Sequence, residues 1–230
     1  MFNPFVLYLF LFLFIANRGI IYAFIEGIFN RSTKKNKTKD ITDKKILDLI
    51  YKKTGLKLSK ILLFDTSKVW AMMAGFPPKP YMIISNEAYK NLDKDEMEWI
   101  YLHEAGHYIL WHNLKMALLQ LLFIFPGLIM PIIIKSYILQ IIGSIILAIL
   151  SSILYFYLAR LFEYEASYYA MRRMTNPQAI STLALKAQKR WFDKVKHEKF
   201  HKLFNTWIYD IYENLIQAAK EEIINRKDNI

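Results

Sequence analysis

The sequence predicts an α+β fold that is mainly helical, with a small β-sheet and about three transmembrane helices. Long apolar runs are the first observation behind this prediction, and hydrophobic residues make up 54% of the 230 residues. Short apolar stretches between turn residues indicate strands in the first half of the chain. Charged residues still account for 22% of the chain. We therefore expect membrane-embedded and water-exposed parts in one polypeptide.

The first apolar segment, residues 4–29, is long enough to cross a bilayer. A cleaved signal peptide is the alternative, but no positively charged region precedes the run and no small-residue cleavage site follows it. We therefore expect an uncleaved anchor over residues 1–30. Arg18 interrupts the run. Because a charge at the membrane centre costs about 2.5 to 3.5 kcal/mol, its side chain should reach the interface or face other helices.

A water-exposed block over residues 31–112 follows the anchor. Turn residues and apolar runs divide it into one helix, three strands, a short helical piece and a longer helix. The expected elements are a helix over 43–53 capped by Thr42 and ended by Thr54 and Gly55, strands at 61–64, 70–74 and 81–85, a short helix opened by Ser85 or Asn86, and a long helix capped by Asp93 with Glu96 three residues later.

Residues 116–159 form the next apolar segment, and Lys135 is its single charge. As one helix these residues would extend about 66 Å, twice the thickness of the hydrocarbon core. We therefore expect a transmembrane hairpin over 113–159, with crossings near 116–134 and 137–159 and a reversal between Pro126 and Ser136. A hairpin buried in a soluble protein is excluded because too little polypeptide remains to cover it.

The remaining block, residues 160–230, is expected to be helical to about 174, interrupted near Asn176-Pro177, and helical again. Two crossings between the polar blocks place both on one side of the membrane. Residues 31–60 carry eleven basic and three acidic groups, so that side is predicted to be the cytoplasm. Attraction to anionic lipid explains the net charge of +11, and no nucleic-acid partner is expected.

The motif His-Glu-Ala-Gly-His at residues 103–107 carries the chemistry. Residues four apart share one face of a helix, so His103 and His107 converge with Glu104 beside them. This pattern is typical of a hydrolytic zinc site, in which Glu104 takes the proton of the attacking, zinc-bound water. The chain contains no cysteine, so histidines and carboxylates must supply the ligands. Two histidines and a carboxylate also suit iron or manganese.

A catalytic zinc ion needs a third protein ligand and an open position. Glu163 and Glu165 are the first carboxylates after the hairpin. They point about 200° apart on a helix, so only one of them can reach the metal. The residues by themselves leave both open.

These features resemble the integral-membrane zinc metallopeptidases of the HtpX-like and CAAX prenyl protease type, over roughly residues 60–175. The resemblance rests on the 103–107 motif, the hairpin, and Arg160-x-x-Glu163-Tyr-x-Ala166, where the family has its zinc-binding glutamate; residues 70–75 and 81–85 also look like the family's edge-strand region. It implies a membrane-anchored, zincin-like metalloprotease fold. It also implies one zinc ion held by His103, His107 and Glu163, and endopeptidase activity on membrane proteins, as in quality control.

An extended peptide is the expected substrate, because a strand at 81–85 beside the zinc helix would offer a free edge for strand addition. Three departures from the family pattern motivate an alternative, a catalytically impaired zinc-binding membrane protein that acts in signalling or scaffolding. Ser167 replaces an aspartate, which predicts weaker support of the metal; His112 stands where relatives carry an aspartate; and the downstream His-Pro is missing. The candidate donors to the reaction's oxyanion are Tyr164, Tyr168, Tyr169, His197 and His201.

Overall fold

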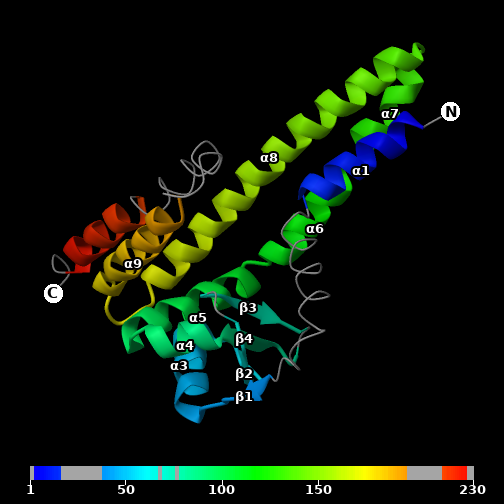
Figure 1. Ribbon diagram of the computed structural model, residues 1–230. Coiled ribbons are helices and arrows are strands. Elements are labelled where there is room, and N and C mark those ends of the chain that lie inside the picture. Colours follow the sequence, from blue (N-terminus) through cyan, green and yellow to red (C-terminus); the bar gives the residue numbers. More distant parts are fainter. Residues whose placement is uncertain (1–2, 17–37, 67–68, 76–77, 196–213, 227–230) are drawn as a thin grey trace. The chain divides into compact units, whose positions relative to one another are not determined.

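The computed structural model describes residues 3–16, 38–66, 69–75, 78–195 and 214–226 (Figure 1). The chain divides into two compact units, one of residues 1–36 and 111–163, the other of residues 37–110 and 164–230. The boundary between residues 163 and 164 falls inside helix α8 (Tyr137–Met171).

The second unit contains a four-stranded sheet. Its strands are β1 (Lys39–Asp40), β2 (Ile61–Phe64), β3 (Ala71–Ala74) and β4 (Tyr81–Ser85), in the order β1-β2-β4-β3. Strand β4 pairs in parallel with β2 and antiparallel with β3. The prediction of a free edge at 81–85 is therefore wrong. Strand β4 is central because it pairs with a strand on each side, and β3 lies at the edge.

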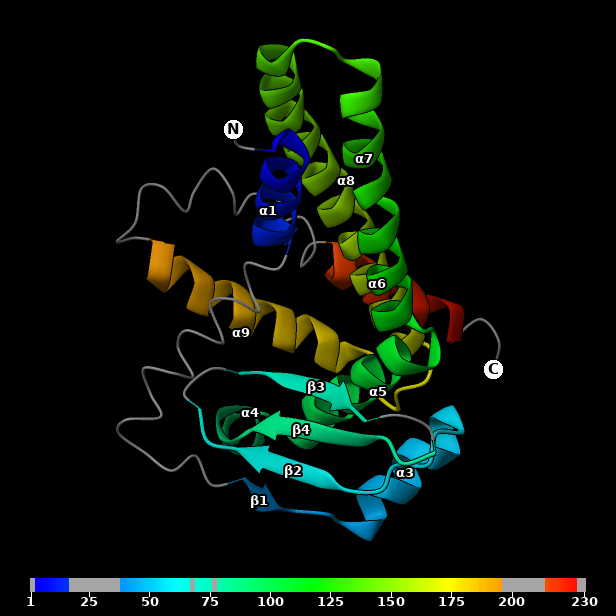
Figure 2. The ribbon, with the colours of Figure 1, turned by 90° about the vertical axis from the view of Figure 1, so that its right-hand side faces the viewer.

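Helices α3 (Lys44–Thr54), α4 (Asn86–Asn91) and α5 (Lys94–Ile109) cover one face of this sheet, as Figures 1 and 2 show. Gly55, with φ of 73°, ends α3 as predicted. The cap of α3 is Asp43 and not Thr42, whose hydroxyl instead bonds to the Asp40 carboxylate and accepts from the Ile61 amide. Thr42 thus joins two strands and is not available as a cap.

The longer helix α5 begins with the predicted capping box. The Asp93 carboxylate accepts from the Glu96 amide at 2.9 Å, and the Glu96 carboxylate accepts from the Asp93 amide at 3.0 Å. Helix α5 packs against β3 over an apolar core. The buried members of that core are Ile50, Leu58, Ile61, Met73, Met82, Ile84, Ala88, Met97, Ile100, Tyr101 and Ala105.

A second core lies on another side of α5, where the end of α8, α9 (Gln178–Val195) and a helix over 214–226 meet. Leu102 of α5 is fully buried there. The predicted interruption at Asn176-Pro177 is confirmed, since α8 ends at Met171 and the Asn176 side chain accepts from the Gln178 amide at the start of α9. Helix α5 is therefore enclosed by the sheet and by these helices.

The first unit is helical, with α1 (Pro4–Ala16), α6 (His112–Leu122), α7 (Ile124–Ile133) and the first part of α8. His112–Ile133 and Tyr137–Met171 are long and apolar enough to cross a membrane, by length and composition. The chain reverses at residues 134–136, within the predicted range. Pro126 does not turn the chain because it lies in the first turn of α7, where a missing amide costs no helical hydrogen bond.

Helix α1 packs into this unit through Tyr8 and Phe12, which are fully buried. The Tyr8 hydroxyl donates to the Phe123 carbonyl, and the Phe12 ring meets Phe123 edge-on at 5.6 Å. By contrast, Ile132 and Ile133 beside the reversal are 69% and 72% exposed, which the core helix of a soluble protein would not show. The rest of the predicted anchor, with Arg18, lies outside the described residues.

Candidate metal centre

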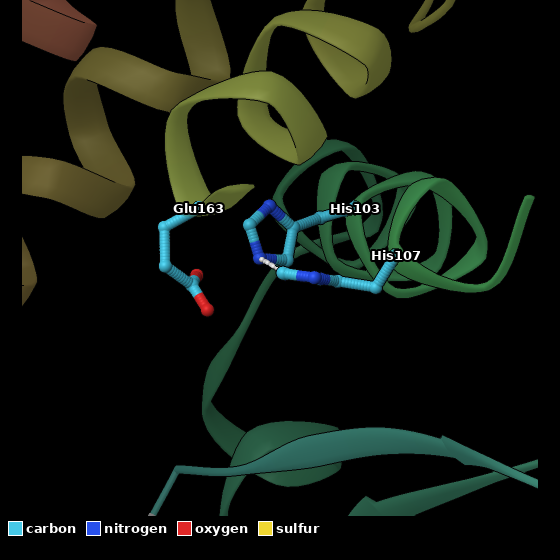
Figure 3. Close-up of side chains that lie close together, drawn as sticks. All are labelled: His103, His107 and Glu163. Atoms are coloured by element: carbon cyan, nitrogen blue, oxygen red, sulfur yellow. Dashed lines mark hydrogen bonds between the residues drawn. The ribbon is translucent and has the colours of Figure 1, made fainter. Parts of the chain in front are cut away.

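Helix α5 carries all three chemically important residues of the motif. Successive residues turn by 100°, so His103, His107 and Glu104 point into a sector about 100° wide. The two histidine rings meet edge to face, with their Nε2 atoms 3.1 Å apart (Figure 3). His103 is buried, and His107 and Glu104 are half-buried. The helix thus directs two imidazole nitrogens to one point.

Glu163 of α8 joins the two histidines. Ligand atoms of His103, His107 and Glu163 all lie within 4.8 Å of one another, and Figure 3 shows the Glu163 carboxylate directed toward the imidazoles. One helical turn further along α8, the Ser167 Oγ lies 3.3 Å from His103 Nδ1. Glu163 and Glu165 are both exposed, but Glu165, the other carboxylate considered from the sequence, does not belong to this group.

Small residues allow α8 to approach α5 closely. A Cβ atom added to Gly106 would lie 3.1 Å from Cδ1 of Tyr169 and 3.4 Å from Cα of Ala166. Ala105 and Ala166 are fully buried. Ala105 and Gly106, the two small residues between the histidines, therefore decide how near α8 can come to α5.

Ser167 lies beside Nδ1 of His103, the ring nitrogen that does not approach His107. Its side chain is buried, and its Oγ lies 3.3 Å from Nδ1. When Nε2 binds a metal, Nδ1 carries the proton and donates it to an outer partner, a role that the serine hydroxyl can fill. The Trp99 ring, one turn earlier on α5, packs on His103 with 4.7 Å between centroids. The sequence indicated Ser167 as a position of outer support but did not predict the contact of Trp99 with His103.

The tyrosines that flank the motif stay uncharged at neutral pH. Burial raises the pKa of Tyr101 far above its usual value, and burial also raises the pKa of Tyr108. Neither phenol therefore adds a negative charge to the helix that carries the histidines. The acidic groups near the histidines are Glu104, which belongs to the motif, and Glu163, which belongs to α8.

Among the described residues, the others singled out in the sequence do not belong to this group of possible metal ligands. The buried His112 ring stacks on Phe162 at 4.8 Å. The Tyr164 hydroxyl accepts from the Asn214 amide at 3.0 Å, and the Tyr169 ring carries the Arg173 guanidinium 3.7 Å from its centroid. Tyr168 is exposed. His197 and His201 lie outside the described residues.

The family model of peptidase family M48 matches residues 36–207, well over half of the chain. The crystal structure of S. mikatae Ste24p is similar with 21% sequence identity and a TM-score of 0.43, over 69% of this chain and 44% of that protein. The chain thus spans less than half of that relative. Comparison with curated proteins gave no match. The family match confirms the resemblance seen in the sequence, and the chain belongs to peptidase family M48, a family of zinc metallopeptidases.

Proposed function

We propose that this protein is a membrane-bound zinc endopeptidase that hydrolyses peptide bonds of membrane or membrane-associated proteins, in the manner of a quality-control protease. One observation carries the proposal: two imidazole nitrogens and one carboxylate meet beside Glu104 in a member of peptidase family M48. The family indicates the class of reaction, and the arrangement of the side chains supports the role proposed for each residue.

The donor set fits zinc. His103, His107 and Glu163 offer two nitrogens and one oxygen, the ligands of many catalytic zinc sites. Zn–N bonds of 2.0 to 2.1 Å in a tetrahedral site separate two nitrogens by about 3.3 Å. The observed separation of the two Nε2 atoms is 3.1 Å, close to that value. Three protein ligands leave one position for water and substrate.

Glu104 is proposed as the general base. Zinc, when bound, lowers the pKa of a water molecule and polarises the scissile carbonyl. The Glu104 carboxylate takes one proton from the attacking water as the new C–O bond forms. The same carboxyl group then gives that proton to the amine as the C–N bond breaks. Glu104 therefore ends the reaction in its starting ionised state.

The substrate is proposed to bind as an extended strand along β3. Among the described residues, β3 pairs with β4 on one side only, and α5 packs against it. Backbone groups of a polypeptide can pair with the open side of such a strand, and this recognises the peptide backbone and few side chains. The binding edge is therefore proposed at Ala71–Ala74 in place of the 81–85 strand expected from the sequence.

The proposed location is the cell membrane, with several crossings and with the active site facing the cytoplasm. Two apolar helices of sufficient length support the membrane location. The eleven basic groups of residues 31–60, which follow the first apolar segment, support the orientation. A protease so placed meets substrates that lie in or on the bilayer.

The test uses full-length protein in detergent with an unfolded protein substrate. Glu104→Gln should bind one zinc ion per chain and cleave nothing, because it keeps the ligands and removes the base. Glu163→Ala should lose the zinc ion, whereas the matched variant Glu165→Ala should retain it.

Three results would contradict the proposal. Cleavage retained by Glu104→Gln would refute the assigned base, and zinc retained by Glu163→Ala would refute the ligand set. Zinc-loaded wild-type protein that shows no chelator-sensitive proteolysis would favour the alternative, an impaired zinc-binding protein in signalling or scaffolding.

A further inference from the structure

Glu98 is a buried carboxylate on α5 that the proposed chemistry does not use. It lies five residues before His103 and is 5% exposed. Its Oε1 atom accepts from Lys53 Nζ at 2.6 Å, and from the amide and the hydroxyl of Thr175 at 3.1 Å each. A buried charge with this many donors forms a rigid junction, because removing one donor leaves a desolvated carboxylate underpaired.

Lys53 extends this junction to the end of α8. It lies in the last turn of α3, and its Nζ also donates to the Arg173 carbonyl at 2.7 Å and to the Thr175 hydroxyl at 2.9 Å. Helix α8 ends at Met171, so Arg173 and Thr175 belong to the turn that leaves it. The junction therefore joins α3, α5 and the end of α8 inside one compact unit.

Helices α5 and α8 also contact each other at two further positions along α5. Ser167 lies beside His103, and Ala166 lies against Gly106. On α5, Glu98 precedes these contacts by one to two helical turns. Its partner Thr175 follows the end of α8, about two turns after the α8 residues that make them. Sliding or tilting of α8 on α5 would have to break the Glu98 junction. We propose that Glu98 and Lys53 are positioning residues for the metal centre, which hold the α8 residues Glu163 and Ser167 in register with the histidines.

The chain offers a matched control on the same helix. Glu96 is fully buried, and its carboxylate accepts from Lys186 Nζ at 2.7 Å and from the Thr182 hydroxyl at 3.2 Å. Both donors belong to α9, which carries no proposed zinc ligand. Removing Lys186 thus breaks a similar ion pair of α5 without releasing α8.

The experiment measures the zinc dissociation constant of the full-length protein in detergent, by competition with a chelator of known affinity. Thermal unfolding of the metal-free protein is recorded for each variant. Lys53→Met should lower the zinc affinity about tenfold, the usual size of the loss when outer support of a metal site is removed, whereas Lys186→Met should change it less than about twofold. Lys53→Arg keeps the charge and several donors and should restore most of the affinity.

This inference rests on the proposed zinc site, and the two can fail separately. Wild-type protein that binds no zinc would refute the proposed function. Wild-type affinity in Lys53→Met, or an equal loss in Lys186→Met, would overturn only the positioning role. If Lys53→Met does not fold, Thr175→Val should lower the zinc affinity and Thr175→Ser should not. Equal affinities of that pair would also overturn the inference.

Discussion

Gly106 offers a direct test of how the two halves of the metal centre are held together. A Cβ atom at this position would lie 3.1 Å from the Tyr169 ring and 3.4 Å from the Ala166 backbone. The ring can move by a few tenths of an ångström, but the backbone of α8 cannot. Alanine also favours a helix by about 1 kcal/mol over glycine, which offsets the crowding. We therefore expect Gly106→Ala to leave the free energy of unfolding within about 1 kcal/mol of wild type.

Gly106→Leu should behave differently because three more heavy atoms point at α8. Overpacking of this kind costs about 1 to 3 kcal/mol in the free energy of unfolding. The strain is relieved only if α8 moves away from α5, which carries Ser167 and Glu163 away from the histidines. We expect the zinc affinity to fall at least about tenfold, since the proposed ligand Glu163 and the outer partner of His103 are both displaced.

The assay combines thermal unfolding of the metal-free protein with chelator competition for zinc. Gly55→Ala is the control, because Gly55 has φ of 73° and open space around its added Cβ. It should cost about 1 to 2 kcal/mol through backbone strain alone and leave the zinc affinity unchanged. Wild-type zinc affinity in Gly106→Leu would refute the view that close packing of α8 on α5 assembles the centre.

Two further predictions concern Ser167 and Tyr101. Ser167→Ala should weaken zinc binding about tenfold, because His103 Nδ1 loses its outer partner, and equal affinities in chelator competition would show that the contact has no such role. Burial raises the pKa of Tyr101 in the folded protein. The stability due to its neutral phenol is therefore complete below the unfolded pKa of about 10 and is lost as the pH rises beyond it. Thermal unfolding between pH 8 and pH 11 should show this loss in wild type and a smaller loss in Tyr101→Phe; identical profiles would exclude Tyr101 as its source.

Local signals in the sequence predicted the elements around the site well. The capping box of Asp93 and Glu96 and the end of α3 at Gly55 were both predicted correctly. These features depend on residues within four positions of one another, so the residues alone determine them. Thr42 was misassigned as a cap because its hydroxyl instead bonds to Ile61, a partner on another strand. The residues next to Thr42 in the sequence give no indication of its contact with Ile61.

Strand order was the main part of the fold that the sequence left undetermined. The apolar run of β4 was recognised as a strand, yet its neighbours depend on a crossover that returns the chain beside β2. Strand β3 precedes β4 in the sequence but lies at the edge of the sheet. Pairing between strands depends on contacts remote in sequence, so a correct strand assignment still placed the open edge on the wrong strand.

The choice between Glu163 and Glu165 shows where a usable signal lay. Ala166, Ser167 and Ala170 are buried, and on a helix all three point within about 60° of the Glu163 direction, whereas Glu165 points about 200° away. Small residues on one face of a helix indicate that another helix approaches there. Gly106 and Ala105 are the matching small residues of α5. Once the packing of these two small-residue faces is known, it favours Glu163 over Glu165 independently of any family resemblance. On this reasoning Ala105 and Gly106 let the helix that carries the proposed third donor come within reach of His103 and His107.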